Sequence, residues 1–237
     1  TKVDVGLFVS NPVFKTKTLN DDLVCLKSLP TNFPARKYME DRKVPLKDLY
    51  YTNDFAEYVK NQFPENDKQL YKEPRIVIPF YDKSGNLLGV QGRAIGSSKI
   101  KYITIKNEDA PKIFGWNTID ESKRIYVVEG PIDSMFLENG VATADSHLEF
   151  VTKYLDKSKV TLVFDNEPRN KDICKQIDQA IENHCNVVIW PDMMENYKDI
   201  NDMILNGFSP DEIQDIISKH TFVNLRAKAE FINWKKV

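Results

Sequence analysis

The sequence predicts an α/β fold in which a mainly parallel sheet flanked by helices follows a smaller mixed α+β lobe. Segments 74–81 and 86–95 read as the two strands of a hairpin, with turn-forming residues between them. From residue 124 onward, apolar runs alternate with helical segments, which is typical of a parallel sheet with helices on its faces. The 237 residues, 41% of them hydrophobic, suffice for one large or two small domains with a real core.

The amino-terminal elements are less regular than those that follow. Residues 3–9 alternate between apolar and polar and predict an edge strand. Residues 46–65 predict a helix that stops at Pro64. After the hairpin, residues 100–105 continue the same sheet. We expect residues 1–122 to form the amino-terminal lobe.

The carboxy-terminal elements carry clear helix signals. Residues 169–184 predict a helix because Ile173, Ile177 and Ile181 form one apolar stripe. Residues 199–206 predict another. Ser209 and Pro210 then begin a further helix as N-cap and first helical residue, with acids in its first turn. We expect a catalytic domain over 123–208 and a helical segment over 209–237.

The most informative stretch is 125–133, an apolar run that ends in Glu129. Gly130 and Pro131 predict a sharp turn into a helix, and Asp133 follows four residues after the glutamate. The turn places Glu129 at the carboxyl end of a strand, where open α/β sheets build their sites. The alternative is a surface acid at a strand end, which the turn and the partner aspartate make the weaker interpretation.

Two more acidic groups follow later apolar runs. Asp165 and Glu167 come after residues 160–164, and Asp199 and Asp202 come after residues 187–190. Acids at strand ends could converge at one sheet edge, where oxygen ligands suit a hard cation such as Mg²⁺. The alternative is that these acids only begin helices, where negative charge is favourable; for Asp199 and Asp202 the two interpretations weigh equally.

These motifs resemble the TOPRIM domain, which bacterial-type DNA primases, type IA and type II topoisomerases and some nucleases share. The pattern is Glu-Gly-x-x-Asp at 129–133, Asp-x-Glu at 165–167 and Lys-Asp-x-Asn-Asp at 198–202. The family usually has Asp-x-Asp as its second motif, so Glu167 is a departure that keeps the charge and lengthens the reach.

The segment before these motifs resembles the basic amino-terminal part of the primase RNA-polymerase core. It contains a strand–turn–strand unit with Gly92-Arg93, then Lys101-Tyr102, and then a linking Lys-Ile-Phe-Gly at 112–115. Residues 34–42 resemble the family's small helix near the start of that core. The resemblance covers roughly residues 30–210, and the phage primases of the T-even type resemble the chain most.

The resemblance implies roles for each site residue. Glu129, Asp165 and Glu167 would be catalytic and would hold Mg²⁺ or Mn²⁺, with Asp199 and Asp202 as outer or second-metal ligands and Gly130 and Asp133 in support. Glu129 could instead be the general base. The template, primer and triphosphate would be held by six basic residues: Arg75, Arg93, Lys99, Lys101, Lys112 and Lys198. Gly92 would leave room for a close phosphate approach.

The charge distribution agrees with such a division of labour. The net charge is only −2, but residues 71–105 contain six basic residues against two acids, and residues 191–217 contain seven acids against Lys198. A basic wall facing an acidic metal site is what a polymerase needs. The alternative is chance clustering on solvated faces.

Cysteine usage and hydropathy point to a cytoplasmic protein, in the host cell if the chain is phage-encoded. Cys25, Cys174 and Cys185 are widely spaced and are expected to be free thiols. We expect no zinc in this chain, because no Cys/His metal spacing is present, and we expect the chain to begin after a zinc module. No signal peptide or membrane-spanning stretch is evident, so no membrane partner is expected.

The predicted function is a DNA primase core that makes short RNA primers by two-metal nucleotidyl transfer. The expected partners are a single-stranded DNA template, ribonucleoside triphosphates and a replicative hexameric helicase, with a single-stranded DNA-binding protein as a further candidate. A TOPRIM nuclease and a non-catalytic DNA-binding scaffold are the alternatives. The basic segment opposes the first and the intact acidic trio opposes the second. A topoisomerase is weaker still, since no domain for a tyrosine nucleophile accompanies the motifs.

Overall fold

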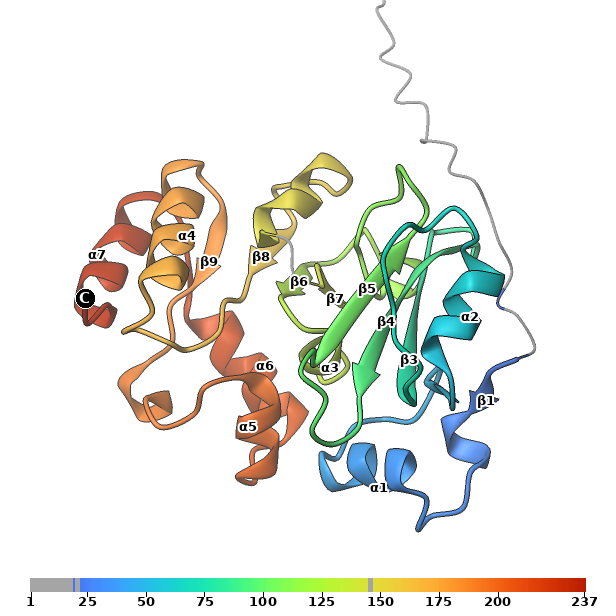
Figure 1. The fold of residues 1–237 in the computed structure, drawn as a ribbon. Coiled ribbons are helices and arrows are strands. Elements are labelled where there is room, and N and C mark those ends of the chain that lie inside the picture. The colour runs from blue at the N-terminus through green and yellow to red at the C-terminus, as the bar shows by residue number, and fades with distance from the viewer. Residues whose placement is uncertain (1–18, 20–21, 145–146) are drawn as a thin grey trace, which may run out of the picture.

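Two five-stranded sheets lie side by side in the computed structural model, which describes Leu19, residues 22–144 and residues 147–237 (Figure 1). The first sheet is antiparallel, and the second is parallel except at one edge. The predicted fold class is therefore confirmed. The strand predicted at residues 3–9 lies outside the described residues.

The first sheet has the strand order β1-β2-β3-β4-β5. Its strands are β1 (Val24–Cys25), β2 (Tyr50–Thr52), β3 (Arg75–Tyr81), β4 (Leu87–Ala94) and β5 (Tyr102–Lys106). The predicted hairpin is confirmed, with Ile76 opposite Arg93 and Pro79 opposite Val90. The helices of this lobe are α1 (Pro34–Asp41) and α2 (Phe55–Gln62), and a 3₁₀ turn covers Leu26–Ser28.

The prediction of one helix over 46–65 is wrong at its amino-terminal end. Tyr50, Tyr51 and Thr52 form β2 instead, because these aromatic and β-branched residues pair with β1 and β3. The helix begins only at Phe55, where the Asp54 side chain accepts a 3.0 Å hydrogen bond from the backbone N–H of Glu57.

The second sheet has the strand order β10-β9-β8-β6-β7. Its strands are β6 (Ile125–Val128), β7 (Gly140–Ala142), β8 (Val160–Leu162), β9 (Asn186–Val188) and β10 (Thr221–Phe222). Only β10 runs antiparallel to its neighbour. Because β6 and β8 are adjacent and parallel, their carboxyl ends meet at one edge.

The helices of the second lobe follow the predicted signals. They are α3 (Pro131–Ser134), α4 (Lys171–Glu182), α5 (Ile200–Leu205), α6 (Pro210–Lys219) and α7 (Asn224–Trp234), with 3₁₀ turns at Trp116–Thr118, Leu148–Lys153 and Asp192–Met194. Asn170 caps α4, and Ser209 with Glu212 forms a capping box on α6. The sequence had indicated α3, α4, α5 and α6, and α7 lies within the segment 209–237 that was predicted to be helical, whereas β7 and β10 were not predicted.

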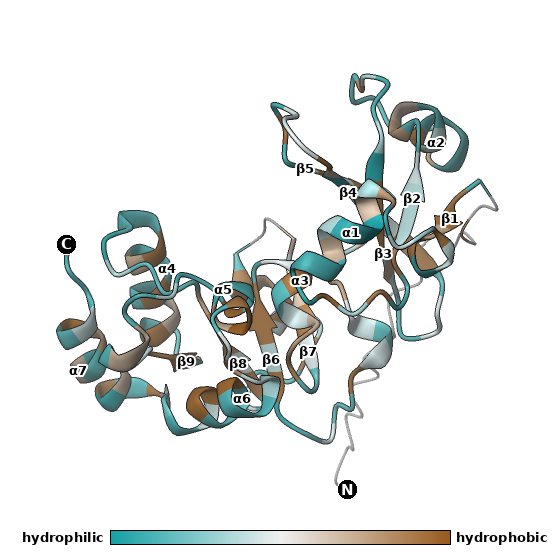
Figure 2. Ribbon diagram, turned by 90° about the horizontal axis from the view of Figure 1, so that it is seen from below, coloured by the Kyte–Doolittle hydropathy of each residue, from teal (hydrophilic) through white to brown (hydrophobic). Residues whose placement is uncertain are grey.

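One hydrophobic core extends through both lobes. It includes Ile76, Ile78 and Phe80 of β3 together with Ile125 and Val127 of β6. Figure 2 shows β6 as strongly apolar, whereas α1 is largely hydrophilic. Because residues of both lobes share this core, it fixes the position of one lobe relative to the other. The predicted domain boundaries stay predictions, although β10, from the 209–237 segment, pairs with the second sheet.

A second, smaller core lies between α2 and the first sheet. Phe55 of α2 packs there with Val77 and Val90. A Cβ built on Gly92 would lie 2.5 Å from the Phe55 ring. The expected phosphate space beside Gly92 is therefore filled by Phe55, and the glycine serves packing instead.

Candidate active site

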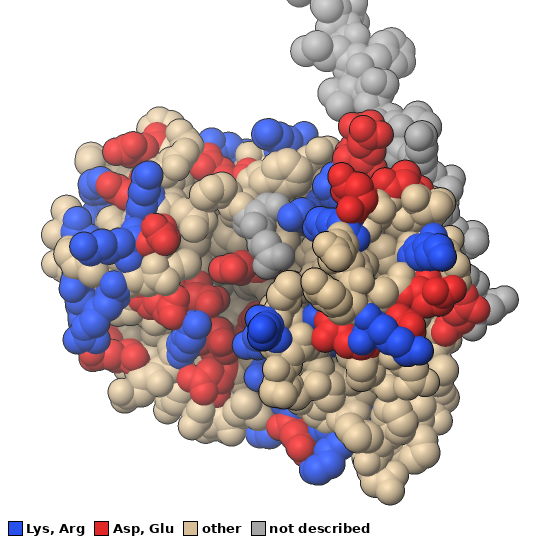
Figure 3. All heavy atoms as spheres, viewed as in Figure 1, with Lys and Arg blue, Asp and Glu red and all other residues tan. Residues whose placement is uncertain are grey.

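A cleft of about 200 Å³ lies between the two sheets. Gln91, Lys101 and Tyr102 line it from the first lobe. Four acidic residues line it from the second lobe, together with Lys198: Glu129, Asp133, Asp165 and Asp199. In Figure 3, acidic side chains gather beside the hollow between the lobes, on the side of the second lobe. The cleft thus brings carboxylates and basic or aromatic groups face to face.

The turn between β6 and α3 supplies two of the carboxylates. The carbonyl of Glu129 accepts a 3.0 Å hydrogen bond from the backbone N–H of Ala144, a residue held at a positive φ of 47°. Asp133 lies in the first turn of α3, and its Oδ1 accepts a 2.8 Å hydrogen bond from the N–H of Asn201. Gly130 is close-packed against it, since a Cβ there would lie 2.9 Å from Asp133 Oδ2.

The loop after β8 carries Asp165 and is tied down through its neighbour Asn166. The buried Asn166 amide donates to the carbonyls of Met194 at 2.7 Å and Tyr197 at 3.0 Å. Its carbonyl oxygen accepts a 3.0 Å bond from Trp234 Nε1 in α7. Its backbone N–H donates to the Lys198 carbonyl at 2.7 Å. One buried amide therefore fixes the Asp165 loop against the Lys198–Asp199 loop.

Burial and mutual repulsion perturb two of the clustered acids. Desolvation, then the charge of Asp199, raises the pKa of Asp133 to about 7. Desolvation, then the charges of Asp133, Glu129 and Asp199, raises the pKa of Asp165 to about 7. The nearby Lys198 only partly offsets this, so the cluster holds more negative charge than its surroundings neutralise.

The amino terminus of α5 positions the third acidic pair. Asp199 is the N-cap, with its Oδ1 accepting a 2.7 Å bond from the Asp202 N–H, and it lines the cleft. Asp202 Oδ2 instead accepts from the backbone N–H of Lys198 at 3.1 Å, and its Oδ1 from the Asn206 amide at 3.2 Å. The structure therefore brings Asp199 to the acidic cluster and engages Asp202 in the helix terminus.

Glu167 reaches the site only through a lysine. Its Oε1 lies 3.1 Å from Lys198 Nζ, and its Oε2 accepts a 2.9 Å bond from the Asn170 amide. Hydrogen bonding to Glu167, with further contributions from the charges of Glu167, Asp165 and Asp199, raises the pKa of Lys198. The ammonium is thus held between the second acidic motif and the cleft.

The donor set fits a divalent cation that also takes ligands from a substrate. Among the described residues, no group of three or more His, Cys, Asp or Glu side chains could hold a metal ion by itself. Mg²⁺, however, is usually held by one or two carboxylates together with waters and phosphates. Carboxyl groups whose pKa values are raised by mutual repulsion are stabilised by an added cation.

The four predicted lysines line two different pockets, and Lys198 lies at the acidic cleft. Lys101 lines the acidic cleft, while Lys99 and Lys112 line a separate pocket along β5. Tyr102 lines both. These lysines are available to a phosphate backbone, and their binding role stays a prediction.

The predicted phosphate contact of Arg75 is wrong. The Arg75 side chain is 0% exposed and forms an ion pair with Glu73. It also donates to the carbonyls of Gly92 at 2.8 Å and Ile100 at 2.7 Å. The buried Arg75 guanidinium cannot reach a ligand. Its hydrogen bonds connect β3 to β4 and to the residues just before β5.

The same correction applies to Arg93. It is buried, and its guanidinium carbon lies 5.1 Å from the Tyr38 ring centroid and 4.4 Å from that of Tyr102. Its Nε donates to Tyr38 Oη at 2.9 Å. Arg93 therefore supports Tyr102 from within by a cation–π contact instead of meeting phosphate.

Three site residues were missed in the sequence. Gln91 lines the cleft, is buried, and leaves its Oε1 without a hydrogen-bond partner. Asn166 and Asn201 fix the acidic loops. Asn201 lies inside the Lys-Asp-x-Asn-Asp motif and Asn166 inside Asp-x-Glu, so their place in those motifs was the available signal. Nothing in the sequence marked Gln91.

Several solved structures that share this fold are primases. No family model matches the chain. The zinc-binding and RNA polymerase domains of the Aquifex aeolicus primase align with a TM-score of 0.61 at 22% identity, over 89% of this chain and 65% of that one. A DnaG primase catalytic domain bound to single-stranded DNA aligns with a TM-score of 0.60 at 16% identity, over 89% and 78%. The fold is therefore that of the primase catalytic cores.

Curated relatives narrow this class. The DNA primase of Enterobacteria phage T4 is 32% identical over 246 residues, which cover 96% of this chain and 71% of the relative. The DNA primase of Mycoplasma genitalium is 22% identical over 180 residues, which cover 69% of this chain and 30% of that protein. The chain belongs to the DNA primase family, a family of enzymes. No described helix is long and apolar enough to cross a membrane.

Proposed function

We propose that this chain joins ribonucleotides into short primers on a single-stranded DNA template. The observation that carries the proposal is the cleft itself, in which four carboxylates face Lys101 and Tyr102. Such a site can hold the triphosphate through cations and the template through a basic and aromatic wall. The family membership supports the same reaction.

The chain's own residues divide the work. Asp165, Glu129 and Asp199, with Asp133 beside them, would hold Mg²⁺ or Mn²⁺. When bound, the cation would neutralise the triphosphate and favour ionisation of the primer 3′-hydroxyl. Glu129 is exposed, and its competing role is that of general base for that hydroxyl. Asp202 and Glu167 act from outside this set, Glu167 by orienting Lys198.

The basic residues hold the negative substrate. Lys101 faces the acidic cluster across the cleft, and Lys198 lies between Glu167 and Asp165. Both would contact phosphates as pyrophosphate leaves. A replicative helicase and a single-stranded DNA-binding protein are proposed partners on family grounds alone, as is action in the cytoplasm.

One assay tests the reaction. The chain is incubated with single-stranded DNA, ribonucleotides and Mg²⁺, and the products are resolved by length, with Asp165→Asn in parallel. We expect new RNA from the wild type and none from the variant. Shortened DNA in place of RNA would make the chain a nuclease. Binding without either product would make it a scaffold.

A further inference from the structure

Gln91 is a buried amide at the floor of the acidic cleft. It lies in β4, lines the cleft and is only 1% exposed. Its two neighbours in the strand face the other way, since Val90 packs in the core with Phe55 and a Cβ on Gly92 would lie 2.5 Å from the Phe55 ring. Because side chains alternate along a strand, Gln91 points from the first sheet toward the lobe that carries the carboxylates.

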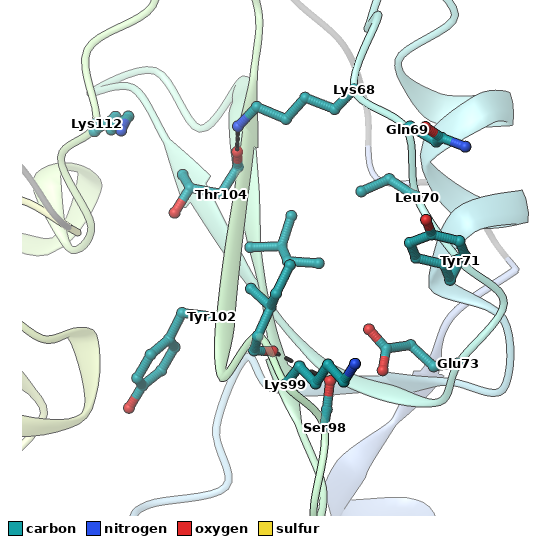
Figure 4. A pocket seen from close by; sticks show the side chains of 12 residues that line it. Lys68, Gln69, Leu70, Tyr71, Glu73, Ser98, Lys99, Tyr102, Thr104 and Lys112 are labelled. Atoms are coloured by element: carbon teal, nitrogen blue, oxygen red, sulfur yellow. Dashed lines mark hydrogen bonds between the residues drawn. The ribbon is translucent and has the colours of Figure 1, made fainter.

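The nitrogen end of this amide is held by the sheet. Gln91 lies opposite Thr104 of β5, and its Nε2 donates a 3.2 Å hydrogen bond to Thr104 Oγ1. Thr104 is fixed in turn, because its carbonyl accepts a 2.8 Å hydrogen bond from Lys68 Nζ (Figure 4). Figure 4 also shows the side chains of Thr104 and Tyr102 on the same side of β5. The oxygen end of the Gln91 amide is therefore left for another partner.

The oxygen end has no partner in the protein. Gln91 Oε1 is buried, and no described residue donates a hydrogen bond to it. A buried acceptor that stays unpaired destabilises a folded protein, so native structures rarely keep one that nothing else uses. The last torsion of a glutamine side chain is soft, so a small rotation turns Oε1 toward the cleft. The floor of the cleft thus holds an unused hydrogen-bond acceptor.

A nucleotide can bring a donor to this position through its sugar. The carboxylates and lysines of the cleft would hold cations and the triphosphate, whose ionised oxygens only accept hydrogen bonds. The group attached to the triphosphate is the sugar, and its hydroxyls donate, whereas base amines lie farther from the phosphates. The 3′-hydroxyl is present in ribonucleotides and deoxyribonucleotides alike. The 2′-hydroxyl is the group that distinguishes them.

We propose that Gln91 Oε1 accepts a hydrogen bond from the 2′-hydroxyl of the incoming ribonucleotide, and that Gln91 thereby sets the preference of the cleft for ribose over deoxyribose. A deoxyribonucleotide would leave the buried oxygen unpaired, and a site built to bind a hydroxyl rejects the analogue that lacks it. The proposal rests on the proposed function, because it concerns the substrate that the same cleft selects.

An amine of a base is the other donor that a nucleic acid offers. Such a contact would depend on which base is present, because adenine carries an exocyclic amine and uracil does not. A contact with the sugar would be the same for both nucleotides. The position of Gln91 in the cleft that the carboxylates line favours the sugar.

The test measures kcat/KM for the addition of one nucleotide by the full chain to an RNA primer annealed to a DNA template. ATP is compared with its 2′-deoxy, 2′-fluoro and 3′-deoxy analogues, since a 2′-fluorine cannot donate a hydrogen bond. The wild type should prefer ATP to the 2′-deoxy and 2′-fluoro analogues. Gln91→Met, which keeps a similar shape without the acceptor, should reduce both preferences about ten- to a hundredfold. Its preference for ATP over the 3′-deoxy analogue should match wild type.

These preferences do not depend on how much of a variant is folded, because both nucleotides are measured on one sample. Gln62→Met is the matched control, since Gln62 is 8% exposed in α2 and is not among the residues that line the cleft. It should keep every preference, and UTP with its analogues should repeat the ATP result. An unchanged 2′ preference in Gln91→Met, a lost 3′ preference instead, equal use of the 2′-fluoro analogue by the wild type, or an effect with ATP but not with UTP would overturn the proposal.

Failure here is separable from failure of the proposed function. Calorimetric titration with ATP and with its 2′-deoxy analogue, in the presence of Mg²⁺, measures the sugar preference without synthesis. If the wild type makes primers and Gln91→Met keeps the sugar preference, Gln91 does not read the sugar and the primase assignment stands. If the wild type makes no RNA although its preference for binding ATP depends on Gln91, the sugar contact stands and the primase assignment falls.

Discussion

Asp165 lies where burial and three neighbouring carboxylates all act in the same direction. Its pKa of about 7 means that the folded protein retains a proton which an unfolded aspartate releases near pH 4. Between these two pH values the folded state binds more protons, so the free energy of unfolding decreases as pH rises. At pH 8 the Asp165 carboxyl is ionised in the folded protein, so the free energy of unfolding is lowered by nearly the full cost of burying that charge.

We therefore expect Asp165→Asn to stabilise the metal-free protein at pH 8, by on the order of 2 kcal/mol, because the variant removes a repelled charge. Urea unfolding at pH 8 and at pH 4 measures this. At pH 4 the two proteins should differ little, since both carry a neutral group. Mg²⁺ should stabilise the wild type more than the variant. A variant less stable than wild type at pH 8 would contradict the repulsion.

Gly130 illustrates how one missing Cβ shapes the site. Its φ of −95° suits any residue, so alanine brings no backbone strain. The new Cβ would lie 2.9 Å from Asp133 Oδ2 and push that carboxylate aside.

Gly130→Ala should reduce primer synthesis about tenfold or more while changing stability by less than about 1 kcal/mol. Gly85→Ala is the matched control, because Gly85 has a φ of 83° with nothing near its Cβ position. That variant should cost about 1 kcal/mol and leave synthesis intact. If Gly130→Ala made primers at the wild-type rate, the position of Asp133 would not matter for the reaction.

At the scale of elements, β4 and β5 divide their basic residues between support and contact. Arg93 of β4 is buried between Tyr38 and Tyr102, whereas Lys101, just before β5, is exposed at the cleft. The two residues look alike in sequence, since both are basic and lie in one short strand unit. Because Arg93 is buried and Lys101 is exposed, the first supports the fold and the second can contact a ligand.

Arg93→Ala should destabilise the protein by roughly 2–4 kcal/mol, because it leaves a cavity and unpairs Tyr38. Its salt slope for single-stranded DNA should match wild type. Lys101→Ala should keep wild-type stability and lower the slope by ~0.7. Urea unfolding and filter binding across a salt series measure both. If Arg93→Ala kept wild-type stability and lowered the salt slope of DNA binding, Arg93 would contact DNA after all.

For the whole molecule, Asn201 connects the acidic cluster to both lobes. Its N–H holds Asp133, its Oδ1 accepts a 2.6 Å bond from Arg42, and its amide donates to the Arg42 carbonyl at 2.8 Å. Lys43 adds a 3.0 Å bond to the carbonyl of Ile204. The two lobes are therefore fixed together at the edge of the site.

Asn201→Ala should lower stability by about 1–3 kcal/mol, since it leaves the partly buried guanidinium and carbonyl of Arg42 without their partner. Primer synthesis should fall by a larger factor than single-stranded DNA binding, because the lobes lose their mutual orientation while the β5 pocket is untouched. Asn206→Ala, at the exposed C-cap of the same helix, is the control and should change neither by much. Equal losses in binding and synthesis would mean that Asn201 supports the fold alone.

The sequence by itself determined the strand-end positions of Glu129 and Asp165, because apolar runs and a Gly-Pro turn are local signals that a parallel sheet preserves. It also determined the hairpin and the capped helices, whose signals lie within a few residues. It did not show that 50–52 would be a strand, because that depends on pairing with β1 and β3.

Only the tertiary structure decided which charged side chains face the cleft. Arg75 and Arg93 lie in the same strand unit as Gln91 and Lys101, and the burial of the two arginines against Glu73 and Tyr38 could not be read from spacing. Likewise, Asp199 lies in the acidic cluster, whereas the Asp202 carboxylate accepts hydrogen bonds at the amino terminus of α5. The physical reason is that exposure and electrostatic neighbours arise from segments far apart in the chain, whereas strand and cap signals are local.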